Sequence, residues 1–259
     1  MHKQQLSDAL VFFGATGDLA YKKIFPALMI LLKAGKLDVP IIGVAKSAWG
    51  REQLIERARN SLNEYGGGVN EELFAQLAER LDYVGGDYAD AETFTQIKEK
   101  LAGALSPVHY LAIPPFLFGT TVQQLGNAGL AHNARVVVEK PFGNDRTSAQ
   151  ELNDTIHAVF PESAIFRIDH FLGKEAVENL LAFRFANTFL EPIWNRNYVD
   201  SVVISMAEEF GVEGRGRFYD ATGAIRDVIE NHLFQVVALL AMEPPATLDA
   251  ISLHDEQAK

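Results

Sequence analysis

The chain has 259 residues, of which 48% are apolar and 22% charged, and its formal net charge is -11. The apolar content excludes a disordered chain, and the acidic balance argues against nucleic acid or an anionic membrane surface as a partner. Because cysteine is absent and no apolar run approaches the ~20 residues that span a bilayer, we expect a soluble, cytoplasmic protein without disulfides, a cysteine-bound metal or a membrane-spanning segment.

Short apolar runs alternate with amphipathic stretches along the first two thirds of the chain. The runs with strand character cover residues 9–13, 40–45, 82–84, 108–113, 135–139 and 164–168. The stretches with helical spacing cover residues 19–32, 51–64, 71–81, 91–105, 117–130 and 145–159. Strands rich in Val, Ile and Leu that alternate with helices are typical of a parallel sheet covered on both faces. We therefore predict an α/β fold with a Rossmann-like, doubly wound parallel sheet.

The pattern changes after about residue 170. Helical spacing covers residues 174–186, residues 199–207 alternate like a strand with one solvated face, and a long amphipathic helix is predicted over residues 223–241. One strand and one long helix are too little to close a core. We therefore predict domains at residues 1–178 and 179–259, the second an incomplete α+β domain.

A glycine motif links the first predicted strand to the helix that follows it. The motif runs from Gly14 to Ala20 as Gly-Ala-Thr-Gly-Asp-Leu-Ala. Glycines let the backbone approach a pyrophosphate, whose charge a helix N-terminus favours. The spacing departs from the usual Gly-x-Gly-x-x-Gly, so a tight turn with a helix cap is the alternative. Lys46 follows the second predicted strand, where a basic residue suits the 2′-phosphate of NADP, although a solvated lysine also fits there.

Two segments place cations after predicted strands, where open parallel sheets bind ligands. Lys140 follows a Val-Val-Val run and precedes a proline, so it can bind an anion or polarise a hydroxyl; a surface lysine in a turn is the alternative. In RIDHFLGKE, residues 167–175, His170 and Lys174 are four apart and share one face of a predicted helix. They are candidates for a phosphate clamp, with an ordinary solvated helix start as the alternative.

A third segment, residues 226–232, lies on the long predicted helix and contains Asp227 and His232. Oxidation of a sugar hydroxyl by a nicotinamide needs a base for the hydroxyl proton. Histidine steadied by a carboxylate is the usual choice near neutral pH, so His232 is a candidate base. A structural histidine is the alternative.

Together these segments resemble the glucose-6-phosphate dehydrogenase family from about residue 9 to the last residue. The matching pieces are FGATGDLAYKKIFPAL, EKPFG, RIDHFLGKE, LAFRFAN, PIWNR, EGRGRFYD and IRDVIENHLFQ. RIDHFLGKE is the most specific of them. The resemblance implies an NADP-dependent oxidoreductase of carbohydrate metabolism that converts glucose 6-phosphate to 6-phosphoglucono-1,5-lactone, the first step of the oxidative pentose phosphate pathway. It implies no metal, because hydride transfer requires only the nicotinamide and a base.

The resemblance also implies a role for each matching residue. His232 takes the proton of the C1 hydroxyl, and Asp169 orients that histidine. The implied substrate contacts are Lys140, His170, Lys174, Glu208 and Asp227. The implied cofactor contacts are Gly14, Ala15, Thr16, Gly17, Asp18, Leu19, Lys46 and Lys140.

The chain departs from the family at Tyr21, where many members have lysine, and at Phe171, where tyrosine is common. Loss of that tyrosine hydroxyl implies weaker substrate binding. Family members are nearly twice as long, so the resemblance covers about their N-terminal half and omits most of a large antiparallel sheet and much of a homodimer or tetramer interface. We expect this chain alone to be poorly stable or inactive. The alternatives are a sugar oxidoreductase of the glucose–fructose oxidoreductase type and a non-catalytic fragment that binds nucleotide.

Overall fold

The computed structural model describes residues 6–143, 145–207, 209, 211–212, 214, 216–247 and 249–259, with the backbone alone at 217, 218 and 221. Contacts divide the chain into two compact units, Met1–Ile168 and Asp169–Lys259. The predicted division into domains at residues 178 and 179 stays a prediction. No helix in the described ranges is long and apolar enough to cross a membrane.

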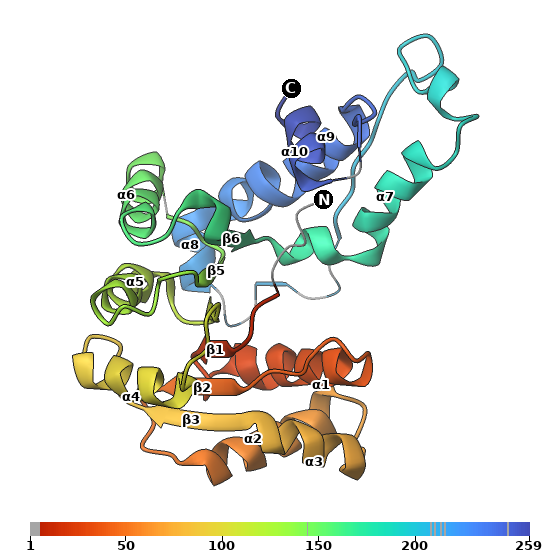
Figure 1. Cartoon of the computed structure of the whole chain (residues 1–259). Helices are drawn as coiled ribbons and strands as arrows, with labels where there is room; N and C mark the ends of the chain where they lie inside the picture. Colours follow the sequence, from red (N-terminus) through yellow and green to blue (C-terminus); the bar gives the residue numbers. More distant parts are fainter. Residues whose placement is uncertain are drawn as a thin grey trace. The chain divides into compact units, whose positions relative to one another are not determined.

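A parallel six-stranded sheet forms the centre of the first unit (Figure 1), with strand order β3-β2-β1-β4-β5-β6. The strands are β1 (Leu10–Phe13), β2 (Ile41–Ala45), β3 (Leu81–Gly85), β4 (Val108–Leu111), β5 (Arg135–Glu139) and β6 (Ile165–Ile168). Because β1 pairs with β2 on one side and β4 on the other, the order of the strands reverses between β1 and β4. Ligands of such sheets bind at this reversal, outside the carboxyl ends of the strands. The predicted doubly wound α/β fold is confirmed.

Helices cover both faces of this sheet. One face carries η1 (Ala20–Ile24), α1 (Phe25–Lys33), α2 (Arg51–Tyr65) and α3 (Glu71–Arg80). The other carries α4 (Ala91–Leu101), η2 (Pro115–Leu117), α5 (Phe118–Asn127) and α6 (Arg146–His157), and η3 (Glu162–Ala164) precedes β6. Neighbouring residues of a strand point to opposite faces, so Phe12 packs in the first core and Phe13 in the second.

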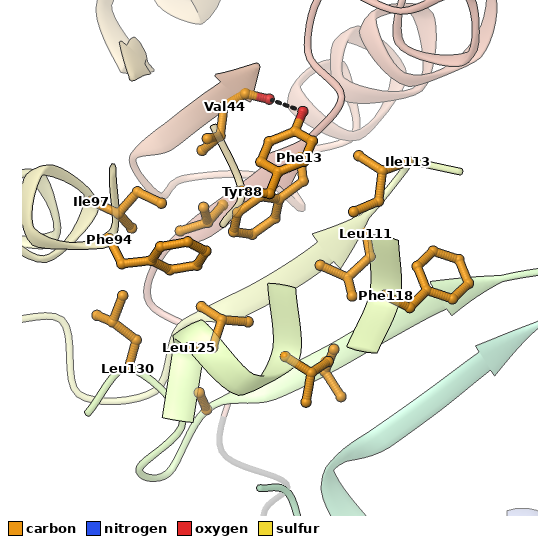
Figure 2. Packing of buried hydrophobic residues seen from close by; sticks show 14 of the residues in the cluster. Phe13, Val44, Tyr88, Phe94, Ile97, Leu111, Ile113, Phe118, Leu125 and Leu130 are labelled. Carbon is orange, nitrogen blue, oxygen red and sulfur yellow. Dashed lines mark hydrogen bonds between the residues drawn. The ribbon is translucent and has the colours of Figure 1, made fainter. Parts of the chain in front are cut away.

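Aromatic packing in the second of these cores fixes the end of β1 (Figure 2). The ring of Phe13 lies edge-on to Tyr88, with centroids 5.8 Å apart, and is stacked on Phe94 at 6.1 Å. The Tyr88 hydroxyl donates to the carbonyl of Val44 at 3.3 Å. The core therefore holds the ends of β1 and β2 together, where the glycine motif begins.

Two helices of the first unit end earlier than predicted. The helix predicted over residues 91–105 ends at Leu101, because Ala102 has a φ of +39° and Gly103 a φ of +97°, both in the left-handed region. The helix predicted over residues 117–130 ends at Asn127, and Gly129 has a φ of +71°. A residue in the left-handed region ends a helix, and glycine is the usual one.

Every secondary-structure element assigned in the described part of the second unit is a helix. It contains η4 (His170–Gly173), α7 (Glu175–Phe185), η5 (Glu191–Ile193), α8 (Gly216–Ala224), η6 (Ile225–Leu233), α9 (Phe234–Ala241) and α10 (Ala250–Ala258). Its small core joins α7 to α9 and contains Phe171, Val177, Val236, Leu239 and Met242.

Two predictions for the second unit are wrong. Residues 199–207 form no strand, since a strand needs a neighbour for its backbone hydrogen bonds and the described residues of this unit contain none. The long helix predicted over residues 223–241 is divided into α8, the π-helix η6 and α9. Gly223 breaks it near its start, with a φ of +70° and a ψ of 166°. The helix α10 was not predicted.

Candidate active site

A glycine turn follows β1 at the carboxyl edge of the sheet. Gly14 has a φ of +85°, and a Cβ there would lie 2.1 Å from the carbonyl oxygen of Ala112, so the position requires glycine. The amide of Gly14 donates to the carbonyl of Val44 at 2.8 Å, and the amide of Gly17 donates to the carbonyl of Gly14 at 2.9 Å. These bonds hold the turn against β2, directly before η1.

The other predicted cofactor residues of the turn differ in exposure. Ala15 is fully buried, whereas Asp18 and Leu19 are exposed. The Thr16 hydroxyl accepts a hydrogen bond from the Ser47 hydroxyl at 3.2 Å, which joins the turn to the segment after β2. The helical backbone begins at Asp18, directly after Gly17, and continues through η1 into α1. Such a helix start favours an anion.

Lys46 follows β2 at the same edge of the sheet and pairs with Asp87, which follows β3. Its Nζ lies 2.8 Å from Oδ2 of Asp87, and both side chains are about half exposed. The Lys46 ammonium holds the pKa of the Asp87 carboxyl below its usual range. A phosphate that binds Lys46 would therefore compete with a carboxylate already in contact with it.

Lys140 follows β5, so it also lies at the carboxyl edge. It is half-buried, and its peptide bond to Pro141 is cis. The preceding Glu139 accepts a hydrogen bond from the Tyr110 hydroxyl at 2.5 Å. Burial, with this carboxylate beside it, raises the pKa of Tyr110. The hydrogen bond between Tyr110 and Glu139 links β4 to the end of β5, directly before Lys140.

In the second unit, Asp169 and His232 form a buried pair. Nδ1 of His232 lies 2.8 Å from Oδ1 and 2.9 Å from Oδ2 of Asp169, and the two side chains are 8% and 13% exposed. Oδ1 of Asp169 also accepts a hydrogen bond from the amide of Phe171 at 3.0 Å, as the N-cap of η4. The carboxylate fixes the orientation of the ring and favours the tautomer protonated at Nδ1, so Nε2 carries the lone pair.

Two rings from RIDHFLGKE lie against the ring of His232. Phe171 is stacked on it, with centroids 4.8 Å apart and planes at 23°, and His170 is edge-on at 5.5 Å. Lys174 Nζ lies 4.7 Å from the centroid of Phe171. The prediction that His170 and Lys174 share a helical face is wrong. The 3-10 helix η4 ends at Gly173, and Lys174 has an extended backbone before α7 begins.

The remaining predicted substrate residues are Asp227 and Glu208. Asp227 is half-buried in η6, a π-helix whose hydrogen bonds join residues five apart, so it lies about one turn before His232. Glu208 lies outside the described residues. Within the described ranges, no group of three or more His, Asp and Glu side chains can hold a metal ion.

Models of one enzyme family match both parts of the chain. The model described as "Glucose-6-phosphate dehydrogenase, NAD binding domain" matches residues 11–179, and "Glucose-6-phosphate dehydrogenase, C-terminal domain" matches residues 181–259. The chain belongs to the glucose-6-phosphate dehydrogenase family. The resemblance seen in the sequence motifs is thereby confirmed, and the first match identifies a domain that binds a nicotinamide dinucleotide.

Relatives and solved structures of this family cover nearly all of the chain. Glucose-6-phosphate 1-dehydrogenase 1 of Mycobacterium bovis is 47% identical over 253 residues, covering 98% of this chain and 54% of the relative. The Saccharomyces cerevisiae glucose-6-phosphate 1-dehydrogenase is 42% identical, and the match covers 99% of this chain and 54% of the relative. The crystal structure of the Mycobacterium avium glucose-6-phosphate 1-dehydrogenase is 47% identical with a TM-score of 0.91. The match covers 98% of this chain and 56% of that one.

A further structure, titled as glucose-6-phosphate dehydrogenase in complex with its substrate glucose-6-phosphate, is 38% identical with a TM-score of 0.90 and covers 99% of this chain. This chain spans 56% of that one and about half the length of the relatives it matches.

Sequence reasoning missed two charged residues near the glycine turn. Asp87 pairs with Lys46, and its signal was an acidic residue just after a predicted strand at the same sheet edge. Arg57 of α2 donates from Nη2 to the carbonyl of Gly17 at 3.2 Å. Helical periodicity places Arg57 beside the buried stripe of α2, three residues after Leu54, but gives no sign that it contacts the glycine turn.

Proposed function

We propose that the chain carries the active-site half of an NADP-dependent glucose-6-phosphate dehydrogenase, which oxidises D-glucose 6-phosphate to 6-phosphoglucono-1,5-lactone. The observation that carries this proposal is the buried pair of Asp169 and His232. A histidine held by a carboxylate in a site of low exposure is the arrangement that removes a proton from a sugar hydroxyl near neutral pH.

In the proposed reaction, Nε2 of His232 accepts the proton of the C1 hydroxyl while the C1–O bond becomes a carbonyl. A nicotinamide dinucleotide held by the residues of the glycine turn would supply the acceptor for the hydrogen on C1, which leaves as a hydride. Asp169 keeps Nδ1 protonated before the transfer and stabilises the imidazolium after it, because its negative charge lies within 3 Å of the ring nitrogen. The hydride from C1 and the proton from the hydroxyl together remove two electrons and two protons, which balances the conversion of the sugar to the lactone.

The substrate phosphate is assigned to His170 and Lys174. Both side chains are exposed, and they lie beside Phe171, which is in contact with the ring of His232. Cationic donors of this kind bind phosphate through charge-assisted hydrogen bonds. Asp227 and Glu208 remain the proposed contacts to sugar hydroxyls, and Lys140 remains a proposed contact to both substrate and cofactor.

The residues of the glycine turn fit a dinucleotide. The turn offers the Thr16 hydroxyl and the helix start at Asp18 to a pyrophosphate, with Gly17 and Asp18 exposed. Lys46 after β2 supports NADP over NAD, since a basic residue at this position suits the 2′-phosphate and an acidic one suits the ribose hydroxyls. A homodimer or tetramer and a cytoplasmic location are proposed from the family resemblance and from composition.

Hydride transfer under single-turnover conditions tests the proposed function. The chain is supplied in excess over glucose 6-phosphate with NADP, so that a slow reaction is still detected, and reduced cofactor is followed by fluorescence. Because the chain spans about half the length of its relatives, we expect only slow reduction; it should require glucose 6-phosphate, fail with unphosphorylated glucose and be slower still with NAD. Equal reduction with unphosphorylated glucose would favour a sugar oxidoreductase of the glucose–fructose oxidoreductase type. Dinucleotide binding without any reduction would favour a non-catalytic fragment.

A further inference from the structure

A cavity of about 290 Å³ lies beside the glycine turn, between η1 and α2. Its lining residues are Tyr21, Trp49, Gln53, Glu56, Arg57 and Asn60. Pockets for whole small-molecule ligands span about 300–1,000 Å³, so a cavity of this size suits one part of a larger ligand. None of these six residues belongs to the cofactor set assigned above.

Arg57 is held in this cavity by two aromatic rings. Its guanidinium carbon lies 4.6 Å from the centroid of Tyr21 and 5.8 Å from that of Trp49, and Nη2 donates to the carbonyl of Gly17 at 3.2 Å. Aromatic rings stack on the flat face of a guanidinium, and its N–H groups then point outward in the guanidinium plane, where they can bind a ligand. Nε is buried and has no hydrogen-bond partner among the described residues.

Charge balance distinguishes Arg57 from the cations around it. Lys46 pairs with Asp87, and Arg59, two residues along α2, pairs with Glu71 at 2.5 Å. Arg57 has no carboxylate within salt-bridge distance in the part of the chain that the structure describes. Glu56 also lines the cavity but is exposed. An anion that enters the cavity would therefore meet a guanidinium that is already oriented and carries no bound carboxylate.

We propose that Arg57, oriented by Tyr21 and Trp49, binds the 2′-phosphate of NADP and sets the preference for NADP over NAD. This inference rests on the proposed function. In dinucleotide-binding sheets the ribose hydroxyls lie at the end of the second strand. Here the hydrogen bond between Ser47 and Thr16 joins that strand end to the glycine turn, whose Gly17 carbonyl Arg57 contacts.

The chemistry of the 2′-phosphate matches Arg57 better than Lys46 alone. A phosphate monoester carries about 1.5 to 2 negative charges near neutral pH, and the planar guanidinium binds two of its oxygens at once. Lys46 is a point charge and is already paired with Asp87. The ring of Tyr21 lies against the guanidinium of Arg57, so α2 presents a cation next to the glycine turn.

Isothermal titration calorimetry of the whole chain with NADP and with NAD tests this inference. We expect Arg57→Met to raise the Kd for NADP about tenfold or more and to change the Kd for NAD less than twofold. Arg59→Met is the matched control, because it removes the same charge from the same helix, and both dinucleotides should then bind as to the wild type. Arg57→Lys keeps the charge without the planar donors, so it should weaken NADP binding by a smaller factor.

Unchanged NADP binding in Arg57→Met would overturn the inference. An equal loss of NADP and NAD binding would also overturn it, because it would mean that Arg57 only supports the glycine turn. In either case the wild type still binds NADP and the proposed function stands. If the wild type binds neither dinucleotide, the proposed function fails and this inference fails with it. Should Arg57→Met fail to fold, which circular dichroism would show, Arg57→Lys decides by the same comparison.

Discussion

His109 makes the stability of the first unit depend on pH. Its side chain is fully buried in β4, and Nε2 donates to the carbonyl of Leu130 at 2.9 Å, whereas Nδ1 is buried with no partner among the described residues. Burial lowers the pKa of His109 from 6.5 to about 4, because the charged ring would lose its hydration. The folded chain therefore keeps this histidine neutral at pH values where the unfolded chain protonates it.

The size of the effect follows from the two pKa values. As the pH falls below 6.5, the unfolded state binds a proton first, so the free energy of unfolding decreases until the folded pKa of about 4 is reached. At one pH unit below 6.5 the loss is about 1.4 kcal/mol, and below pH 4 it approaches about 3 kcal/mol. Above pH 7 the contribution of His109 to this dependence disappears.

Urea unfolding at pH 7.5 and 5.5 measures this loss. The fluorescence of Trp49 reports the first unit in a Trp194→Phe background, since the chain has two tryptophans. His109→Gln keeps a donor for the carbonyl of Leu130 but cannot titrate, so it should lose about 1.4 kcal/mol less than the wild type between the two pH values. His132→Gln, at an exposed histidine, is the control and should behave like the wild type. The reasoning is refuted if His109→Gln and the wild type lose equal stability.

Three further substitutions test the turn, an ion pair and the substrate site. Gly14→Ala should destabilise the chain by over 1 kcal/mol more than Gly67→Ala in urea unfolding, because both positions have positive φ but the added Cβ meets a carbonyl oxygen at Gly14 alone. Glu162→Gln should lower the free energy of unfolding at pH 7 by about 1 kcal/mol, a figure reduced for the exposure of the Glu162 side chain. The difference in free energy of unfolding between the wild type and this variant should shrink as the pH falls from 4.5 toward 2. Arg167 lowers the pKa of Glu162 to about 2, so the folded wild type loses its carboxylate only over this range. Phe171→Tyr should lower the Kd for glucose 6-phosphate severalfold by calorimetry, and an unchanged or higher Kd would contradict the role given to the missing hydroxyl.

The sheet was predictable because its strands are rich in apolar residues, and β1 and β2 are buried on both faces. The run from Val136 to Val138 and the runs at Leu10–Phe13 and Ile41–Ala45 are almost wholly apolar, and they alternate with helical spacing. That pattern also placed the glycine turn, Lys46 and Lys140 at strand ends. The pairing of Asp169 with His232 came from the family resemblance, because nothing in the spacing of two residues 63 apart predicts contact.

The features that were not predictable depend on long-range contacts. Residues 199–207 have a strand pattern but no neighbouring strand in the described part of their unit. The π-helix at Ile225–Leu233 has the same amphipathic pattern as an α-helix, so periodicity does not distinguish them. The orientation of Arg57 depends on the ring of Tyr21, which is 36 positions away in the sequence, so no local pattern predicts it.

The rate of hydride transfer in variants of the buried pair tests the central claim most directly. Single-turnover reduction of NADP by glucose 6-phosphate is compared in the wild type, His232→Asn and Asp169→Asn, with the Kd for glucose 6-phosphate measured in each. We predict that His232→Asn lowers the rate by about 100-fold or more and Asp169→Asn by at least tenfold, while the Kd changes less than about threefold. A rate in His232→Asn within twofold of the wild type would contradict the assignment of His232 as the base.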